Sequence, residues 1–176
     1  MITPTTYIAA VNMQKQNVAT HALLNSVEHT HLLLIQEPWY SKVGTAQKDD
    51  TREGVDSLGG AASPAWDLHY PAVHGNAKAK VMAYSRKWVW RDDNIPIFFT
   101  VTPQHNICAH PCIMVLEVIY NTEKWYIVNF YNDMRDKSAL DTLLKLDLDP
   151  LVSTLVVRDF NTHSHLWSLP TTAPSH

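Results

Sequence analysis

Short apolar runs alternate with polar clusters along the chain, and this pattern predicts mostly β-strands. The runs are too short for helices and are rich in β-branched or aromatic residues, as is typical of buried strands. Seven segments fit this description: residues 7–13, 32–35, 81–85, 97–101, 113–120, 124–131 and 154–157. Only Asn121, Thr122 and Glu123 separate the fifth segment from the sixth, which is the pattern of a β-hairpin.

Two further segments have helical spacing. The first follows Asn17, which we expect to cap it, and its apolar residues form one stripe: Ala19, Ala22, Leu23 and Val27. The second begins at Ser138, with Asp141 placed as in a capping box, and ends at Pro150. Its stripe consists of Leu140, Leu143, Leu144 and Leu148. Each stripe predicts a helix that packs one face on the core.

Residues 41–79 contain all five glycines together with scattered Asp, Ser and Pro. This composition predicts a long irregular connection with one short strand near residues 66–70. No linker or repeat divides the chain, so we expect one domain over residues 1–169, followed by a short tail at 170–176.

Composition favours a globular protein and sets limits on its partners. Hydrophobic residues make up 45% of the 176 residues and charged residues 18%, which excludes a disordered chain. The net charge of -3 gives no global attraction for nucleic acid, so binding of a polyanion must rest on local cations or on a metal ion. No apolar stretch is long enough to span a membrane, and we expect a cytoplasmic or nuclear protein.

The two cysteines, Cys108 and Cys112, lie close to His105 and His110. These four residues crowd one short segment, whereas structural zinc sites usually combine two separated pairs of ligands. We therefore favour ordinary loop and strand-end residues over a zinc site.

Polar residues follow several of the predicted strands at the point where each strand ends. They are Asn12, Glu37, Asn132 and, after the last strand, Asp159 and Asn161. Residues at the carboxyl ends of buried strands converge on one rim, which is where α/β scaffolds build sites. A single carboxylate with neighbouring amides and an Asp suits Mg²⁺, which keeps water and substrate phosphate among its ligands. The alternative for each residue, and for Asn132 above all, is a solvated turn.

Four motifs in order carry a resemblance to a known family: VNMQ with Asn12, IQEPWY with Glu37, VNFYND with Tyr131, and RDFNTHSHLW with Asp159. They resemble the motifs of the endonuclease/exonuclease/phosphatase superfamily, and most closely those of the endonuclease domain of non-LTR retrotransposons. The resemblance runs from Asn12 to Trp167. It implies a four-layer α/β/β/α sandwich, in which two mixed sheets are flanked by helices, and a Mg²⁺- or Mn²⁺-dependent endonuclease that hydrolyses DNA phosphodiesters.

The resemblance also implies a role for each matched residue. Glu37 would bind the metal with the help of Asn12, and Tyr131 would donate a hydrogen bond to the scissile phosphate. Asp159 and Asn161 would orient the attacking water and stabilise the developing charge. His163 would lie at the rim of the site or pack beside it.

Two residues are expected to contact substrate, Asn132 and Arg158. Arg158 stands where the family normally has Gly before the DFN motif. Either the end of that strand is distorted, or the guanidinium reaches outward to a phosphate.

The family also has a Ser-Asp-His motif on a late strand, which supplies the general base, and nothing matching it follows Trp167. We therefore expect a sandwich that lacks its last strands and exposes a sheet edge able to pair with another chain. Loss of a general base typically costs a factor of about 10² to 10⁴ in rate. The alternatives to a working endonuclease are an inactive relic or interaction domain with the same fold, and a phosphodiesterase for small molecules or lipids.

Basic and aromatic residues offer two further hypotheses for nucleic-acid binding. Lys78, Lys80, Arg86 and Lys87 would form a strip for backbone phosphates, or would simply be a solvated face. Four aromatic residues would stack on bases, or would pack at strand ends: Trp39, Tyr40, Trp88 and Trp90.

Overall fold

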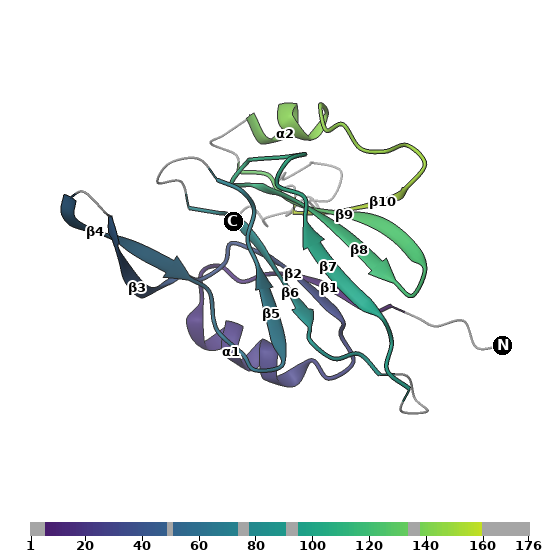
Figure 1. The fold of residues 1–176 in the computed structure, drawn as a ribbon, viewed down its shortest axis with the longest axis horizontal. Helices are drawn as coiled ribbons and strands as arrows, with labels where there is room; N and C mark the ends of the chain where they lie inside the picture. Colours follow the sequence, from purple (N-terminus) through teal and green to yellow (C-terminus); the bar gives the residue numbers. More distant parts are fainter. Residues whose placement is uncertain (1–5, 49–50, 74–77, 91–94, 134–137, 160–176) are drawn as a thin grey trace, which may run out of the picture.

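The described residues form two large β-sheets packed face to face, with one helix on the outer side of each sheet, and a separate two-stranded hairpin (Figure 1). The computed structural model describes residues 6–48, 51–73, 78–90, 95–133 and 138–159. In chain order the elements are β1 (Ile8–Asn12), α1 (Asn17–Ser26), β2 (Leu32–Gln36), β3 (Ser41–Lys48), β4 (Thr51–Gly59), β5 (Trp66–His69), β6 (Val81–Arg86), β7 (Phe99–Pro103), β8 (Ile113–Tyr120), β9 (Glu123–Tyr131), α2 (Ser138–Leu143) and β10 (Ser153–Asp159).

Both large sheets are mixed. The first has the order β1-β2-β6-β5, and the second has the order β10-β9-β8-β7. In each sheet one pair of strands is parallel, β1 with β2 and β10 with β9, and the other pairs are antiparallel. Figure 1 shows α1 against the first sheet and α2 against the second. The predicted four-layer arrangement of two mixed sheets flanked by helices is confirmed.

Strand β2 shows how the sequence produces these layers. All five of its residues are buried, because α1 covers one face and the second sheet covers the other. Leu33 and Ile35 pack in the cluster that includes Leu24 of α1. Leu32 and Leu34 point the opposite way, into the core between the sheets. The continuous apolar run in the sequence therefore reflects burial on two faces.

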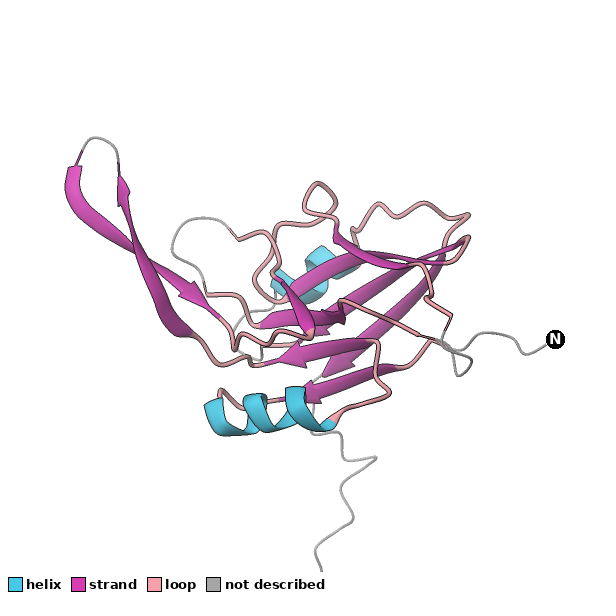
Figure 2. Ribbon diagram, turned by 60° about the horizontal axis from the view of Figure 1, so that its bottom comes forward, coloured by secondary structure: helices cyan, strands magenta, loops and turns pink. Residues whose placement is uncertain are grey.

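The prediction of an irregular connection over residues 41–79 is wrong in its first half. Strands β3 and β4 pair there as an antiparallel hairpin, with register shifts near Gly44 and Lys48. Figure 2 shows that the hairpin extends away from the two sheets. A hairpin that is not packed on the core needs no alternation of apolar residues, so its sequence resembles that of a loop. The short strand predicted near residues 66–70 is confirmed as β5.

The second helix is shorter than its leucine spacing predicts. It ends at Leu143, and the backbone then tightens into bonds between residues three apart, from Leu146 to Leu143 for example. Leu144 is exposed, whereas Leu146 and Leu148 still pack against the core. Of the predicted stripe, Leu140 is also exposed and only Leu143 and Leu148 contact the core, the latter from an irregular segment, so the prediction of one continuous helical stripe on the core is wrong.

Two smaller boundaries also differ from the predictions. Gln16, not Asn17, occupies the cap position of α1, and its side chain makes no capping hydrogen bond. Strand β7 begins at Phe99, two residues later than expected. The reason is that the N–H of Ile97 donates to the carbonyl of Val89 in the preceding connection, and not to β8.

Strand β10 forms the end of the second sheet in the described part of the chain. Leu155 and Val156 are 40% and 45% exposed there, so apolar side chains of this strand contact solvent. Self-association through this edge stays a prediction. No helix among the described residues is long and apolar enough to cross a membrane.

Candidate active site

Four strands end at the same rim of the sandwich. The parallel register places Asn12 at the end of β1 beside Gln36 at the end of β2. In the second sheet it places Asp159 at the end of β10 beside Tyr131 at the end of β9. A direct contact between Tyr131 and Glu37, the residue after β2, joins the two pairs of strand ends. The convergence that the sequence predicted therefore occurs for Asn12, Glu37 and Tyr131.

The half-buried carboxylate of Glu37 is held at one of its two oxygens. Its Oε1 accepts a 2.7 Å hydrogen bond from the hydroxyl of Tyr131 and a 3.2 Å hydrogen bond from Nδ2 of Asn12. No described residue donates a hydrogen bond to Oε2. Because Oε1 is fixed by two donors from two different sheets, the orientation of the carboxylate is fixed, and its other oxygen, Oε2, has the chemistry of a ligand for a hard cation.

The backbone at Glu37 has an uncommon conformation. Its φ of 45° lies in the left-handed region, which costs a residue other than glycine on the order of 1–3 kcal/mol. Two neighbouring segments fix it: the Glu37 N–H donates to the carbonyl of Lys80 at 2.9 Å, and the N–H of Lys15 donates to the Glu37 carbonyl at 2.8 Å. These bonds turn the chain after β2 so that the side chain meets its two donors.

The loop after β1 fixes the orientation of Asn12. Its Oδ1 accepts a 2.9 Å hydrogen bond from the N–H of Gln14, so the amide nitrogen is directed to Glu37. Gln14 and Lys15 both have positive φ, 47° and 59°, which folds the loop back toward the rim. The side-chain amide of Asn12 thus links the loop to the carboxylate.

Directly beneath Glu37, two buried amides connect the sheets. Nε2 of Gln36 donates a 2.8 Å hydrogen bond to Oδ1 of Asn129 on β9. Nδ2 of Asn129 donates to the carbonyls of Ile35 and Met82, at 3.2 and 3.0 Å. The pattern of apolar and polar residues did not predict this pair. A polar residue within an otherwise apolar strand was the signal that could have revealed it.

Lys80 places a cation at the rim. Its Nζ lies 3.8 Å from Oδ2 of Asp133, which follows β9, and both side chains are partly exposed at 35% and 24%. The Lys80 carbonyl also accepts the bond from Glu37, so the backbone of this lysine is attached to the site.

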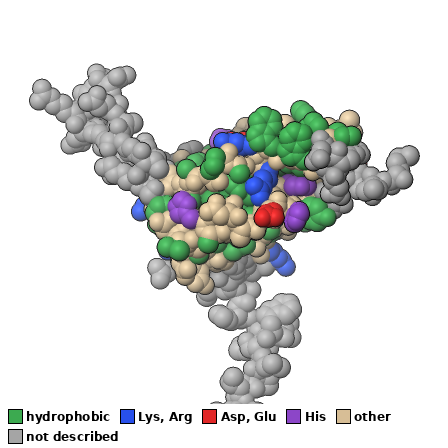
Figure 3. All heavy atoms as spheres, turned by 90° about the horizontal axis from the view of Figure 1, so that it is seen from below, with side chains coloured by type: hydrophobic (Ala, Val, Ile, Leu, Met, Phe, Trp, Pro, Cys, Tyr) green, Lys and Arg blue, Asp and Glu red, His purple; other side chains and the backbone are tan. Residues whose placement is uncertain are grey.

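Arg86 and Lys87 do not extend Lys78 and Lys80 into a strip of four cations, so the strip as predicted is not formed. Arg86 and Lys87 lie at the opposite end of β6, about 20 Å away for six residues of strand. The guanidinium of Arg86 donates to the carbonyls of Val27, Glu28 and Thr30 and lies 4.2 Å from the centre of the Trp66 ring. Seen from below, the cationic side chains are scattered (Figure 3).

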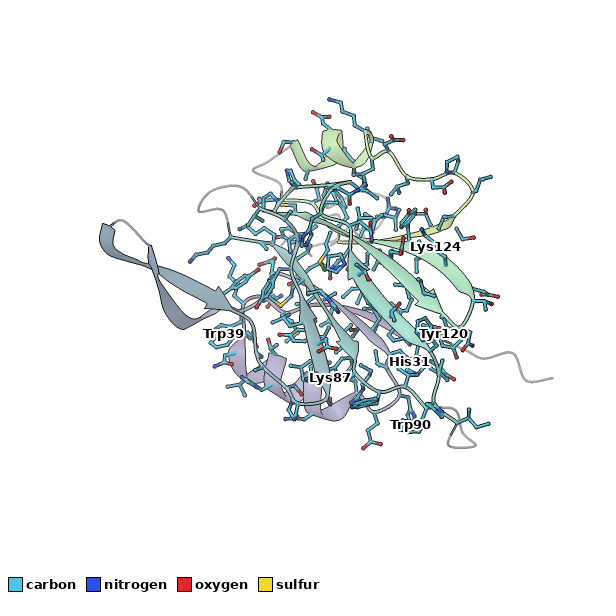
Figure 4. All side chains as sticks on the ribbon, viewed as in Figure 1. His31, Trp39, Lys87, Trp90, Tyr120 and Lys124 are labelled. Carbon is cyan, nitrogen blue, oxygen red and sulfur yellow. The ribbon has the colours of Figure 1, made fainter. Side chains whose placement is uncertain are left out.

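The aromatic residues proposed for base stacking are likewise dispersed. Trp39 is half-buried, with its ring centre 6.3 Å from that of His21, and the hydroxyl of Tyr40 donates to the carbonyl of Ala79. Trp88 and Trp90 are exposed, 74% and 55%. Figure 4 shows Trp90 far from Trp39. The four residues therefore do not form one stacking platform.

Several predicted site residues are described in part or not at all. Asn161 and His163 lie outside the described residues, and for Asp159 only the backbone position beside Tyr131 is described. Asn132 is half-buried directly after β9. Arg158 stays in regular register with Phe130 and is exposed. The strand is therefore not distorted at Arg158, and the contact of its guanidinium with a phosphate stays a prediction.

The donor set suits a hard cation better than zinc. No group of three His, Cys, Asp or Glu residues able to hold a metal ion exists in the described ranges. Cys108 and Cys112 are buried free thiols, and Nε2 of His110 lies 3.0 Å from Oγ of Ser138. Mg²⁺ needs only one or two carboxylates, with water and phosphate as its other ligands, so Oε2 of Glu37 fits that ion.

Comparison with known proteins confirms the fold. The chain is similar to the endonuclease domain of TRAS1, a telomere-specific non-LTR retrotransposon, with a TM-score of 0.60 and 14% identity. The similarity covers 93% of this chain and 62% of that chain. No protein-family model and no curated protein sequence matches the chain. At this level of identity the similarity shows the fold, the one that the ordered motifs implied.

Proposed function

We propose that this protein is a Mg²⁺-dependent phosphodiesterase of endonuclease type, derived from a retrotransposon, that hydrolyses DNA backbone phosphodiesters. The observation that carries the proposal is the Glu37 carboxylate, held by Asn12 and Tyr131 at the rim where four strands end. The fold that surrounds it is similar to that of an endonuclease domain. A DNA substrate agrees with the cytoplasmic or nuclear location expected from the sequence.

In this proposal Glu37 provides the metal site. Oε2 binds Mg²⁺ or Mn²⁺, and Asn12 and Tyr131 keep the carboxylate oriented through Oε1. When bound, the ion supplies Lewis-acid stabilisation of the charge that develops on the phosphate. The Tyr131 hydroxyl has a single proton, so it donates either to Glu37 or to a phosphate oxygen, and substrate binding exchanges the first acceptor for the second.

Other residues at the rim bind the substrate and orient water. Asp159 is the register partner of Tyr131. In this proposal Asp159 and Asn161 orient the attacking water. By the family resemblance His163 acts at the edge of the site, and Asn132 and Arg158 contact the DNA backbone. Because the chain has a net charge of -3, attraction of the phosphate rests on a local cation; we assign it to Lys80, whose carbonyl accepts a hydrogen bond from Glu37 and whose Nζ lies 3.8 Å from Asp133.

The test is nicking of supercoiled plasmid by the purified chain with Mg²⁺ or Mn²⁺, with and without EDTA. Glu37→Gln removes the charge at nearly constant shape, and we expect it to lower the rate at least about 100-fold, since a bound metal is worth several kcal/mol. Glu117→Gln is the matched control. Glu117 is a partly exposed carboxylate on β8 that pairs with Lys124, away from the rim.

Three outcomes separate the alternatives. Metal-dependent nicking that Glu37→Gln abolishes and Glu117→Gln retains supports the proposal. Equal activity in Glu37→Gln and the parent protein points to a contaminating nuclease and contradicts it. A folded parent protein that nicks with neither metal favours an inactive interaction domain with the same fold.

A further inference from the structure

The contact between Tyr131 and Glu37 crosses from one sheet to the other. Its 2.7 Å length therefore depends on how the two sheets are positioned relative to each other. The core between them is mainly aliphatic, with residues such as Leu34, Leu116 and Ile127. Apolar packing is non-directional and accommodates small shifts, so it does not by itself fix two polar groups at hydrogen-bond distance.

A directional connection exists at this position, made by the side chain of Asn129. Its two amide protons are directed to the carbonyls of Ile35 and Met82, which are register partners on β2 and β6. Its Oδ1 accepts the hydrogen bond from Gln36. Three bonds thus fix one side chain of the second sheet against two strands of the first.

This connection is adjacent to the site along both strands. Gln36 directly precedes Glu37, and Asn129 lies two residues before Tyr131, on the same face of β9. Gln36 is 3% exposed and Asn129 is fully buried. The two side-chain amides and the two backbone carbonyls that they join are tolerated in the core because they are hydrogen-bonded to one another. A shift of the sheets that breaks these bonds is therefore strongly disfavoured.

We propose that Gln36 and Asn129 are positioning residues, which hold the two sheets in the register that places the Tyr131 hydroxyl on Glu37. The effect of this positioning on catalysis rests on the proposed nuclease function. The placement of Tyr131 can be measured without that activity.

The decisive variant replaces both amides, Gln36→Leu/Asn129→Leu. Removal of both side-chain amides avoids leaving one of them buried and unpaired, and the carbonyls of Ile35 and Met82 each lose one donor, so the fold of the variant is verified before the readouts below. Val118→Ala is the control for loss of core packing. Val118 is buried in the same core, but it pairs with Trp125, at the other end of β9 from Tyr131.

The first readout is the ¹³Cζ signal of Tyr131 in protein labelled at tyrosine, assigned by its absence in Tyr131→Phe. Glu37→Ala gives the reference position for a hydroxyl without this acceptor. We expect the double variant to shift the signal toward that reference, and Val118→Ala to leave it in place. An unchanged signal in a folded double variant overturns the proposal. Should the double variant not fold, Gln36→Met is expected to give a smaller shift in the same direction, and no shift overturns the proposal.

The second readout is a double-mutant cycle in the nicking assay. We expect the apolar pair to lower kcat roughly 10- to 100-fold with little change in KM, since small misplacements of catalytic groups have effects of this size. When Tyr131→Phe is added to the apolar pair, we expect kcat to fall by less than about 3-fold, because the contact between Tyr131 and Glu37 is already lost. If Tyr131→Phe lowers kcat by the same factor in the apolar pair as in the parent protein, the proposal is overturned. If the parent protein does not nick DNA, the proposed function fails, and the tyrosine signal still decides the positioning role.

Discussion

The hydroxyl of Tyr131 donates a 2.7 Å hydrogen bond to Oε1 of Glu37, although the two residues are 94 positions apart and belong to different sheets. The bond is charge-assisted when Glu37 is ionised, which makes it stronger than a bond between neutral groups. Together with the bond from Asn12, it leaves Oε2 as the carboxylate oxygen directed to a ligand. In the proposed function, this arrangement lets Glu37 act as the single carboxylate of the metal site.

Tyr131→Phe tests the value of this hydroxyl. A hydrogen bond to a charged group contributes about 1.5–3 kcal/mol, so we expect nicking at saturating metal to fall roughly 10- to 100-fold. Single-turnover rates measure this loss. Tyr84→Phe is the matched control, because it removes a buried hydroxyl that donates to the carbonyl of Ala61 on the outer side of the first sheet. Equal losses in both variants would contradict a specific role for Tyr131.

Asn12→Ala tests the orientation of the carboxylate from the other side. The variant removes one donor to Oε1 and the acceptor for the Gln14 N–H. Loss of such an orienting partner typically weakens metal affinity about 10- to 100-fold, so higher Mg²⁺ concentrations are needed for half-maximal nicking. Metal titrations of the rate measure this shift, and excess Mg²⁺ is expected to restore most activity. Asn17→Ala, at an exposed residue of α1, serves as the control; a similar shift there would show that the effect is not specific.

The strands and the residues at their ends were predictable because they depend on local patterns. Glu37 follows an apolar run whose burial on two faces makes it recognisable, Asn12 ends a short apolar run that is partly buried, and Tyr131 ends a third run. Their convergence follows from the topology that the ordered motifs implied.

Local patterns in the sequence did not predict the amide pair or the β3–β4 hairpin. The partnership of Gln36 with Asn129 spans 93 positions and exists only once the sheets are stacked, which hydrophobic periodicity does not encode. The hairpin extends from the sheets, so no buried face imposes a pattern on its sequence (Figure 2). Both are cases in which tertiary context, or its absence, decides the local structure.

Lys80→Gln tests whether the cation beside the site contacts DNA. We expect KM to rise about 3- to 10-fold and the dependence of log affinity on log salt to become shallower by roughly one unit, as for loss of one phosphate contact. Lys87→Gln removes an equal charge at the other end of β6, where Lys87 pairs with Asp67 at 3.8 Å. DNA binding at several salt concentrations distinguishes the variants. Identical slopes for Lys80→Gln and the parent protein would exclude the contact.

His69 predicts a pH dependence of stability that is independent of catalysis. Its Nε2 lies 2.8 Å from Oγ of the buried Ser85, and burial lowers the pKa of His69 below its ordinary value of 6.5, although the charge of Asp67 partly opposes this shift. The folded protein therefore binds fewer protons at this residue than the unfolded chain does. Its contribution to stability is complete above pH 6.5 and is lost as the pH falls from there through the lowered pKa.

Thermal unfolding between pH 8 and pH 5 measures this contribution, and His69→Gln isolates it from the carboxylates. Glutamine retains a polar side chain for Ser85 but does not titrate, so the midpoint of the variant is expected to fall less steeply below pH 6.5. Burial also lowers the pKa of His31, with smaller contributions from Arg86 and His29, so a residual slope is expected to persist in His69→Gln. If the unfolding midpoints of the parent protein and the variant fall in parallel with pH, protonation of His69 does not lower stability. If the midpoint of the variant falls less steeply than that of the parent protein only below pH 6.5, the partly buried imidazole of His69 is the titrating group.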